Sequence, residues 1–288
     1  MQLDEAIIDK LLARAIEEDL GHGDLTTKLC VSAQTMTSGK LFLKQKGVVA
    51  GMRFVQRLFQ KMDPRTTFTP LVEEGILLNA GTIIAHISGP AQILLSGERV
   101  ALNLLRHTSG VATTTAAYVQ KVKGLPCSIL DTRKTLPGLR ALEKYAVEVG
   151  GGVVHRRGLD DRCIIKNSHL AFIALESKNP ISEAVRRIRA HNSSVPLEIE
   201  LVDLKQLDEI LSLDFQTIIV NNLHPDDTAR CVRKIRKSNK KTLIYFESST
   251  AISLETIRIY AETGVDGIAV SALTYSVQGL EIGMKLLI

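Results

Sequence analysis

The chain has 288 residues, of which 45% are hydrophobic and 4% aromatic, and its formal net charge is +5. This apolar fraction supports a large core in one or two domains, and the shortage of aromatic residues favours close-packed α/β layers over an all-β sandwich. No apolar run is long enough to span a bilayer, and the acidic N-terminus lacks the basic start and apolar core of a secretory signal. We therefore expect a soluble, cytoplasmic protein whose positive charge favours anionic partners and which does not bind membranes.

The first 90 residues predict a mixed domain of helices and strands. Apolar residues at helical spacing predict a helix within residues 1–20, which the glycines of "GHGDLTT" end. Residues 39–51 alternate like a strand pair, and a helix is expected over 52–62. Further strands are expected over 65–72 and 81–90. A long helical stretch over 94–122 follows, with a predicted break near Gly110.

From about residue 127 the pattern becomes regular, because short apolar strands alternate with helices. Such an alternation is typical of βα units and predicts a parallel sheet, either open or closed into a barrel. A further strand is expected near residues 151–154. The six clearer strands are expected over residues 127–133, 163–167, 196–202, 215–222, 242–249 and 266–273.

Polar side chains recur within these strands or where they end. The carboxyl ends of parallel strands meet at one edge of a sheet, and in α/β barrels that edge carries the active site. We therefore expect these side chains to converge. They are Asp131, Arg133, Lys166, Glu198, Glu200, Asn221, Glu247, Ser248 and Ser271.

The cations of this edge predict a polyanionic ligand. Arginine binds carboxylate or phosphate through two parallel hydrogen bonds, and crowded cations repel each other unless an anion offsets them. Glu200 would hold a metal or ribose hydroxyls. Helix capping by Arg156 and Arg157 and a Schiff-base role for Lys166 remain alternatives. The cations concerned are Arg133, Lys134, His155, Arg156 and Lys166.

The residues of this region resemble a known family. The stretch "DTRKTLPGLRALEKYAVEVGGGVVHRRGL", residues 131–159, is similar to the signature of quinolinate phosphoribosyltransferases, also named nicotinate-nucleotide pyrophosphorylases (carboxylating). The resemblance continues in the same order at both ends of the chain. It includes "EDLGHGDLTT", "GERVALNLLRHTSGVAT" and "YAETGVDGIAVSALTYS".

The resemblance implies a fold and a reaction. The fold is an N-terminal α/β sandwich packed on an incomplete, open α/β barrel, like other type II phosphoribosyltransferases. The expected domains are residues 1–112, to which 275–288 return, and residues 113–274. In the implied reaction, quinolinate and phosphoribosyl pyrophosphate give nicotinate mononucleotide, pyrophosphate and CO2 with Mg²⁺, for NAD biosynthesis. The resemblance also implies a homodimer or larger homo-oligomer with shared active sites and no nucleic-acid partner.

The same resemblance assigns roles to individual residues. Arg133 and Arg156 match arginines that hold the quinolinate carboxylates, and Arg99 matches one donated across the dimer. Lys134, Lys166 and Glu200 are the expected catalytic residues, with Glu200 also near the ribose and the metal. The remaining expected substrate-binding residues are His155, Asn221, Ser248, Ser249, Thr250 and Ser271.

This chain departs from the family pattern mainly in the half expected to bind phosphoribosyl pyrophosphate. Asn221-Asn222 replaces Asp-Asn, and Thr250-Ala251 replaces a Gly-Gly pair. Ser271 and Tyr275 stand where glycine and histidine are usual. Side chains in a phosphate cradle obstruct close approach of the backbone.

Three other functions stay open at this point. The altered phosphate half is compatible with a related transferase for another aromatic acid, or with a non-catalytic sensor of carboxylates. Nucleic-acid binding rests only on the pI of about 9.0 and the basic run over 233–241. That run lacks the interleaved aromatic residues that stack on single-stranded bases.

Overall fold

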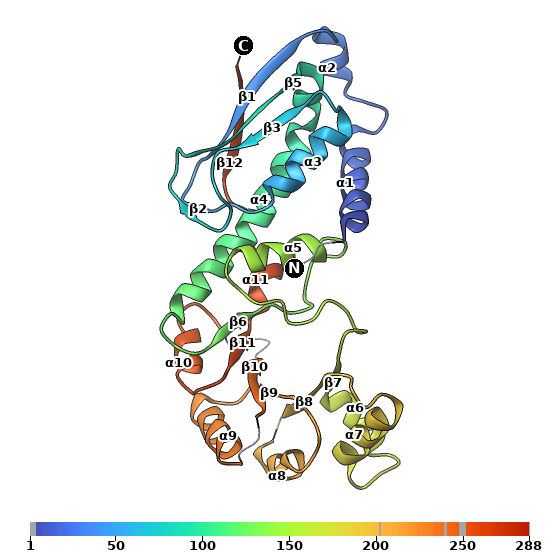
Figure 1. The fold of residues 1–288 in the computed structure, drawn as a ribbon, viewed down its shortest axis with the longest axis vertical. Helices are drawn as coiled ribbons and strands as arrows, with labels where there is room; N and C mark the ends of the chain where they lie inside the picture. The colour runs from blue at the N-terminus through green and yellow to red at the C-terminus, as the bar shows by residue number, and fades with distance from the viewer. Residues whose placement is uncertain (1–3, 202, 239–240, 248–251, 288) are drawn as a thin grey trace. The chain divides into compact units, whose positions relative to one another are not determined.

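The computed structural model in Figure 1 describes residues 4–287 except 202, 239–240 and 248–251. The chain divides into two compact units. The first contains residues 1–116, 134–152 and 272–288, and the second contains residues 117–133 and 153–271. Residues 134–152, which the sequence assigned to the barrel domain, therefore pack within the first unit.

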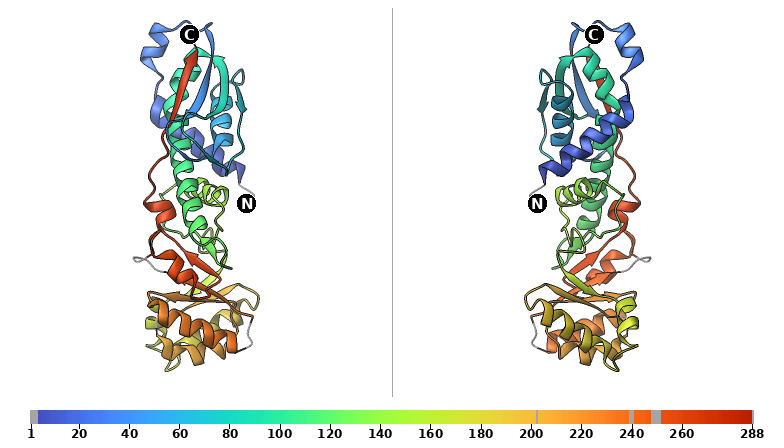
Figure 2. Two further views of the ribbon diagram at one scale, coloured as in Figure 1. Left: turned by 90° about the vertical axis from the view of Figure 1, so that its left-hand side faces the viewer. Right: turned by 90° about the vertical axis from the view of Figure 1, so that its right-hand side faces the viewer.

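The first unit is built on a four-stranded antiparallel sheet. Its strands lie in the order β12 (Ile282–Leu287), β1 (Met36–Leu43), β5 (Ile83–Pro90) and β3 (Thr67–Pro70). Figure 2 shows the red β12 beside the blue N-terminal strand, so the end of the chain returns to this sheet. A second small pair joins β2 (Gly47–Val48) to β4 (Leu77–Leu78).

Helices of the first unit share one hydrophobic core with this sheet. Leu12 of α1, Phe54 of α3 and Leu94 of α4 are each at most 1% exposed, and they belong to the same cluster as Leu41 and Ile84 of the strands. Burial of such side chains supplies most of the stability of a helix in a protein. The helices are α1 (Glu5–Leu20), α2 (Leu25–Cys30), α3 (Met52–Met62), α4 (Ala91–Lys121), α5 (Arg140–Val149) and α11 (Ala272–Tyr275).

Helix α4 is continuous, so the predicted break near Gly110 is wrong. A β-carbon at Gly110 would lie 2.5 Å from the carbonyl oxygen of Gln278 and 2.8 Å from the Val277 side chain. Glycine is needed here because the segment that leads to β12 crosses the helix at close range. Glycine lowers helix propensity by about 1 kcal/mol relative to alanine, which a long packed helix tolerates.

The second unit carries six parallel strands. Their order is β6, β11, β10, β9, β8, β7, and nearly every residue in them is buried or half-buried. Within the described residues the outer strands β6 and β7 do not pair with each other, so the predicted barrel is open. The bounds are β6 (Ser128–Leu130), β7 (Cys163–Ile165), β8 (Leu197–Leu201), β9 (Thr217–Asn221), β10 (Leu243–Glu247) and β11 (Gly267–Ala269).

The strand predicted near residues 151–154 is reduced to a single parallel bridge between Val153 and Leu130. Elsewhere helices follow the strands as predicted, and α7, α8 and α9 lie on one side of the sheet (Figures 1 and 2). No helix in the described part of the chain is both long and apolar enough to cross a bilayer. The helical segments of this unit are α6 (Asn167–Ile173), α7 (Pro180–His191), the 3₁₀ turn η1 (Leu204–Gln206), α8 (Leu207–Leu211), α9 (Pro225–Lys237) and α10 (Ile257–Ala261).

The close crossing at Gly110 predicts that Gly110→Ala destabilises the protein. Overpacking costs about 1–3 kcal/mol, which outweighs a gain of up to about 1 kcal/mol in helix propensity. Urea unfolding followed by circular dichroism should show a lower midpoint. The control is Asn103→Ala at an exposed position of the same helix, which should not lower it. A midpoint for Gly110→Ala equal to that of Asn103→Ala would contradict this account.

Candidate active site

The parallel register brings the predicted polar residues of the second unit to one edge. Ile165 lies opposite Ile199, Glu200 opposite Ile219, and Asn221 opposite Glu247. Arg133 comes three residues after the end of β6, and Lys166 comes directly after β7. Among the described residues, Lys166, Glu200 and Asn221 therefore share this edge, as the strand pattern predicted. Ser248, which belonged to the same prediction, lies outside the described residues.

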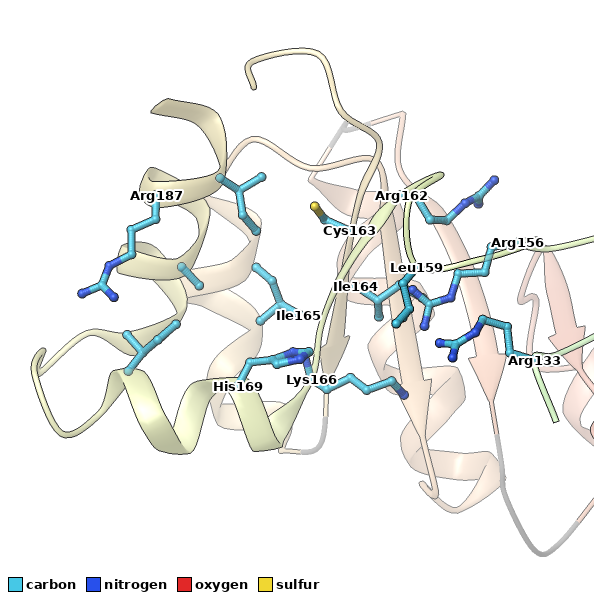
Figure 3. A pocket seen from close by; sticks show the side chains of 13 residues that line it. Arg133, Arg156, Leu159, Arg162, Cys163, Ile164, Ile165, Lys166, His169 and Arg187 are labelled. Atoms are coloured by element: carbon cyan, nitrogen blue, oxygen red, sulfur yellow. The ribbon is translucent and has the colours of Figure 1, made fainter. Parts of the chain in front are cut away.

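A cavity of about 480 Å³ opens at this edge (Figure 3). Its cationic end is formed by Arg133, Arg156 and Lys166, which we name the cation cluster. Its other end is mainly apolar and lies between β7 and helices α6 and α7. The complete lining is Arg133, Arg156, Leu159, Arg162, Cys163, Ile164, Ile165, Lys166, His169, Ile173, Ala184, Arg187 and Ile188.

The cation cluster brings three positively charged side chains to one end of the cavity. In Figure 3 the guanidinium groups of Arg133 and Arg156 lie side by side, and Lys166 extends toward the same region. Burial, followed by the charge of Arg133, lowers the pKa of Arg156, although Glu198, Asp161 and Glu247 act in the opposite direction. A bound dianion would relieve this repulsion and would accept paired hydrogen bonds from the two guanidinium groups. The cluster is therefore suited to a small molecule with two acidic groups.

Glu200 lies beside the cluster with two partners. This residue is 8% exposed, and its Oε2 is 3.4 Å from Nζ of Lys166. Its Oε1 accepts a hydrogen bond of 2.5 Å from the side-chain amide of Asn221. Oδ1 of Asn221 is buried and has no hydrogen-bond partner among the described residues. A carboxylate and an unpaired amide oxygen thus lie next to each other at the ends of β8 and β9.

These oxygen atoms fit part of a magnesium site. Mg²⁺ prefers oxygen ligands and commonly keeps several waters while binding one or two carboxylates and the phosphates of a substrate. The described residues contain no group of three or more His, Cys, Asp or Glu side chains placed to hold a metal. A carboxylate and an amide oxygen could hold such an ion together with substrate and water.

His155 is placed differently from the other predicted binding residues. It is 9% exposed, and its Nε2 lies 3.0 Å from both carboxylate oxygens of Glu198. Its backbone N–H donates to the buried carboxylate of Asp131 (2.8 Å). His155 is not one of the described residues that line this cavity. Its imidazole is therefore held by a carboxylate of β8.

Glu198 is one of the polar side chains that the strand pattern predicted for this edge, but the sequence assigned it no role of its own. Its side chain is buried and also accepts from the Arg162 guanidinium (2.9 Å). Burial alone would raise the pKa of Glu198, but His155 and Arg162 together outweigh burial and lower it. Glu198 therefore remains ionised at neutral pH. Its sequence position contained a usable indication, since alternate residues of a strand face the same side and Glu200 follows two positions later.

The other predicted site residues lie outside this arrangement or at its margin. Ser271 is buried and accepts a hydrogen bond from Thr132 (3.4 Å) within the second unit. Arg99 and Lys134 belong to the first unit, where Arg99 is exposed on α4 and the carbonyl of Lys134 accepts from Thr274 (2.7 Å). Tyr275, also in the first unit, is 51% exposed. Ser248, Ser249, Thr250 and Ala251 lie outside the described residues.

Comparisons with known proteins agree with this geometry. The model of the quinolinate phosphoribosyl transferase N-terminal domain matches residues 24–109, and that of the C-terminal domain matches residues 111–285. A Mycobacterium leprae protein named nicotinate-nucleotide pyrophosphorylase (carboxylating) is 41% identical over 278 residues, which cover 96% of this chain and 95% of the relative. A Synechocystis protein described as a probable enzyme of the same name is 38% identical, with 97% and 92% covered.

Solved structures show the same fold. The crystal structure of NadC from Streptococcus pyogenes aligns with a TM-score of 0.90 at 33% identity and covers 100% of this chain and 99% of that one. The nicotinate-nucleotide pyrophosphorylase from Francisella tularensis aligns with a TM-score of 0.91 at 27% identity, covering 99% and 98%. Because both family models match and the similarity extends over nearly the whole length, this chain belongs to the quinolinate phosphoribosyl transferase family.

Proposed function

We propose that this chain is a carboxylating nicotinate-nucleotide pyrophosphorylase of NAD biosynthesis. It transfers the phosphoribosyl group of phosphoribosyl pyrophosphate to quinolinate and releases pyrophosphate and CO2, which leaves nicotinate mononucleotide. The observation that carries the proposal is the cation cluster of Arg133, Arg156 and Lys166 at the carboxyl edge of the open barrel. Family membership and the names of the relatives support the same reaction.

Quinolinate suits the cluster because it carries two neighbouring carboxylates on a flat ring. The forks of Arg133 and Arg156 would each bind one carboxylate through paired hydrogen bonds, and Lys166 would add a third positive charge. The apolar side chains at the other end of the cavity offer a surface to the ring. Nicotinate, with one carboxylate, would leave part of the repulsion between the guanidinium groups uncompensated.

In the transfer step the ring nitrogen forms a bond to the anomeric carbon of the ribose while the bond to pyrophosphate breaks. Positive charge develops on the sugar, and the carboxylate of Glu200 would stabilise it. The carboxylate next to the ring nitrogen then leaves as CO2. Its bonding electrons remain on the ring carbon beside the cationic nitrogen, and a proton from solvent completes the product. The cluster must orient that carboxylate without stabilising only the ground state.

The metal, the quaternary structure and the location belong to the same proposal. Glu200 and Oδ1 of Asn221 would hold Mg²⁺, which neutralises charge on the departing pyrophosphate when it is bound. Arg99 would reach the site of a second copy in a homodimer. Lys134 and Ser271, with Ser248, Ser249 and Thr250, would contact the phosphates. The protein would act in the cytoplasm.

The reaction is tested by incubating purified protein with quinolinate, phosphoribosyl pyrophosphate and Mg²⁺. Nicotinate mononucleotide, separated by chromatography, should form from quinolinate and not from nicotinate. Turnover of another aromatic acid in place of quinolinate would favour a related transferase. Tight binding of quinolinate by calorimetry without any product would favour a sensor, and either result would overturn the proposal.

The cation cluster is tested by Arg133→Ala and Arg156→Ala. Each variant should weaken quinolinate binding by about 1–3 kcal/mol, the usual range for hydrogen bonds to charged groups. Isothermal titration calorimetry measures the dissociation constant directly. Arg186→Ala, which removes a guanidinium from the exposed face of α7, is the control and should bind like the parent. Unchanged binding in both cluster variants would reject the assignment.

The metal assignment is tested by Asn221→Asp. A second carboxylate beside Glu200 should raise the pKa of one of the two groups and cost about 1–2 kcal/mol of unfolding free energy without divalent cation, the equivalent of about one pKa unit. Mg²⁺ should restore this stability, because a ligand that binds only the folded state stabilises it. Thermal unfolding with and without Mg²⁺ measures both effects. Asn192→Asp, an exposed change of the same kind, should respond to Mg²⁺ like the parent. An equal response in Asn221→Asp would remove Mg²⁺ from this position.

A further inference from the structure

A single buried carboxylate is bonded to both ends of one exposed loop. Glu198 on β8 is 1% exposed. Its carboxylate binds the imidazole of His155 at 3.0 Å and a guanidinium nitrogen of Arg162 at 2.9 Å. Residues 156–161 lie between these partners and contain no helix or strand. The loop thus leaves and re-enters the sheet at two side chains that share one carboxylate.

The first end is held from three different strands. Besides Glu198 of β8, Asp131, which directly follows β6, accepts from the backbone N–H of His155 (2.8 Å). The ring of Tyr245 on β10 packs edge-on against the imidazole, with 5.7 Å between ring centres. Burial, followed by the charge of Glu198, raises the pKa of the Tyr245 phenol, so this ring is neutral. His155 therefore has little freedom while Glu198 is charged.

The loop between the two ends carries part of the cavity wall. Arg156, the residue after His155, belongs to the cation cluster, and Leu159 lines the same cavity. Arg157, Leu159, Asp160 and Asp161 are exposed, so burial does little to hold the loop. One hydrogen bond within it joins the backbone N–H of Arg157 to Asp161 (2.7 Å). In Figure 3 Arg162 points away from the cluster while Arg156 points toward it.

We propose that Glu198 is a positioning residue that fastens both ends of the 156–161 loop and thereby holds Arg156 beside Arg133. An unpaired carboxylate would be costly to bury at this place, and the Arg162 guanidinium and the His155 imidazole supply its hydrogen-bonding partners there. Both partners flank the loop that bears Arg156. The ion pairs therefore act on the position of a binding guanidinium and on the affinity for a dicarboxylate, and this consequence rests on the proposed function.

The tether is tested without any substrate by limited proteolysis with trypsin. Cleavage after Arg156 or Arg157 requires the loop to open locally. Glu198→Gln keeps the size of the side chain but loses its charge. Because local opening of the loop should then cost less free energy, trypsin should cut this variant there at least about fivefold faster than the parent at the same trypsin concentration. Mass spectrometry identifies the cut. Glu262→Gln removes the same charge from an exposed pair with Arg258 and should be cut like the parent. Equal rates at the 156–157 site in Glu198→Gln and the parent would overturn the tether.

The consequence for binding is tested by steady-state kinetics. Glu198→Gln should raise KM for quinolinate about tenfold, the equivalent of about 1.4 kcal/mol, and leave KM for phosphoribosyl pyrophosphate and kcat within about twofold. A purely structural role would instead lower kcat through loss of active protein, with both KM values unchanged, and that result would overturn the proposal.

Two further measurements cover the cases in which Glu198→Gln does not fold or the parent protein is inactive. Arg162→Met releases only the second end and should give smaller increases in cleavage and in KM. It replaces Glu198→Gln if that variant does not fold, and parent-like values for it would then overturn the tether. If the parent protein forms no product from quinolinate, the proposed function fails, while the trypsin comparison still decides whether Glu198 holds the loop.

Discussion

Repulsion among cations at the carboxyl edge of the parallel sheet is the constraint on which the site depends. Arg133, Arg156 and Lys166 converge there because three separate connections end at the same edge. Burial, followed by the charge of Arg133, lowers the pKa of Arg156. Such an arrangement persists only if the fold supplies stability elsewhere, and it favours any ligand that brings two negative charges. A dicarboxylate bound at this edge would offset that repulsion.

Strand β8 carries two of the carboxylates that oppose these cations, and the two have different roles. Glu198 and Glu200 face the same side because they are two positions apart, but they have different partners. Glu198 is saturated by His155 and Arg162 deep in the unit, which favours a role in holding the chain in place. Glu200 lies nearer the edge, where it contacts Lys166 and the amide of Asn221, so it can respond to a substrate or a cation. Strand β8 therefore carries one carboxylate that holds the chain in place and another that can contact a substrate or a cation.

Much of the fold and of the candidate site could be predicted from the sequence because the strands are short, apolar and separated by helices. Strand-end polarity placed Arg133, Lys166 and Asn221 at one edge without any structure. The pairing of His155 with Glu198 could not be predicted, since partners 43 positions apart on different segments meet only when the sheet forms. The break expected at Gly110 failed for a related reason. A glycine that allows a distant segment to approach looks, in sequence, like one that ends a helix.

The asparagine at position 221, where the family pattern has aspartate, can be understood from the balance of charge around Glu200 and Lys166. Asn221 keeps the hydrogen bond that orients Glu200, yet it adds no negative charge beside that carboxylate. Lys166 then faces one carboxylate rather than two, so more of its positive charge remains available to an anionic substrate. Oδ1 of Asn221, which has no hydrogen-bond partner among the described residues, retains the capacity to accept from a ribose hydroxyl or to bind a cation. An amide at this position therefore lowers the negative charge beside Glu200 while it preserves the hydrogen bond that orients this carboxylate.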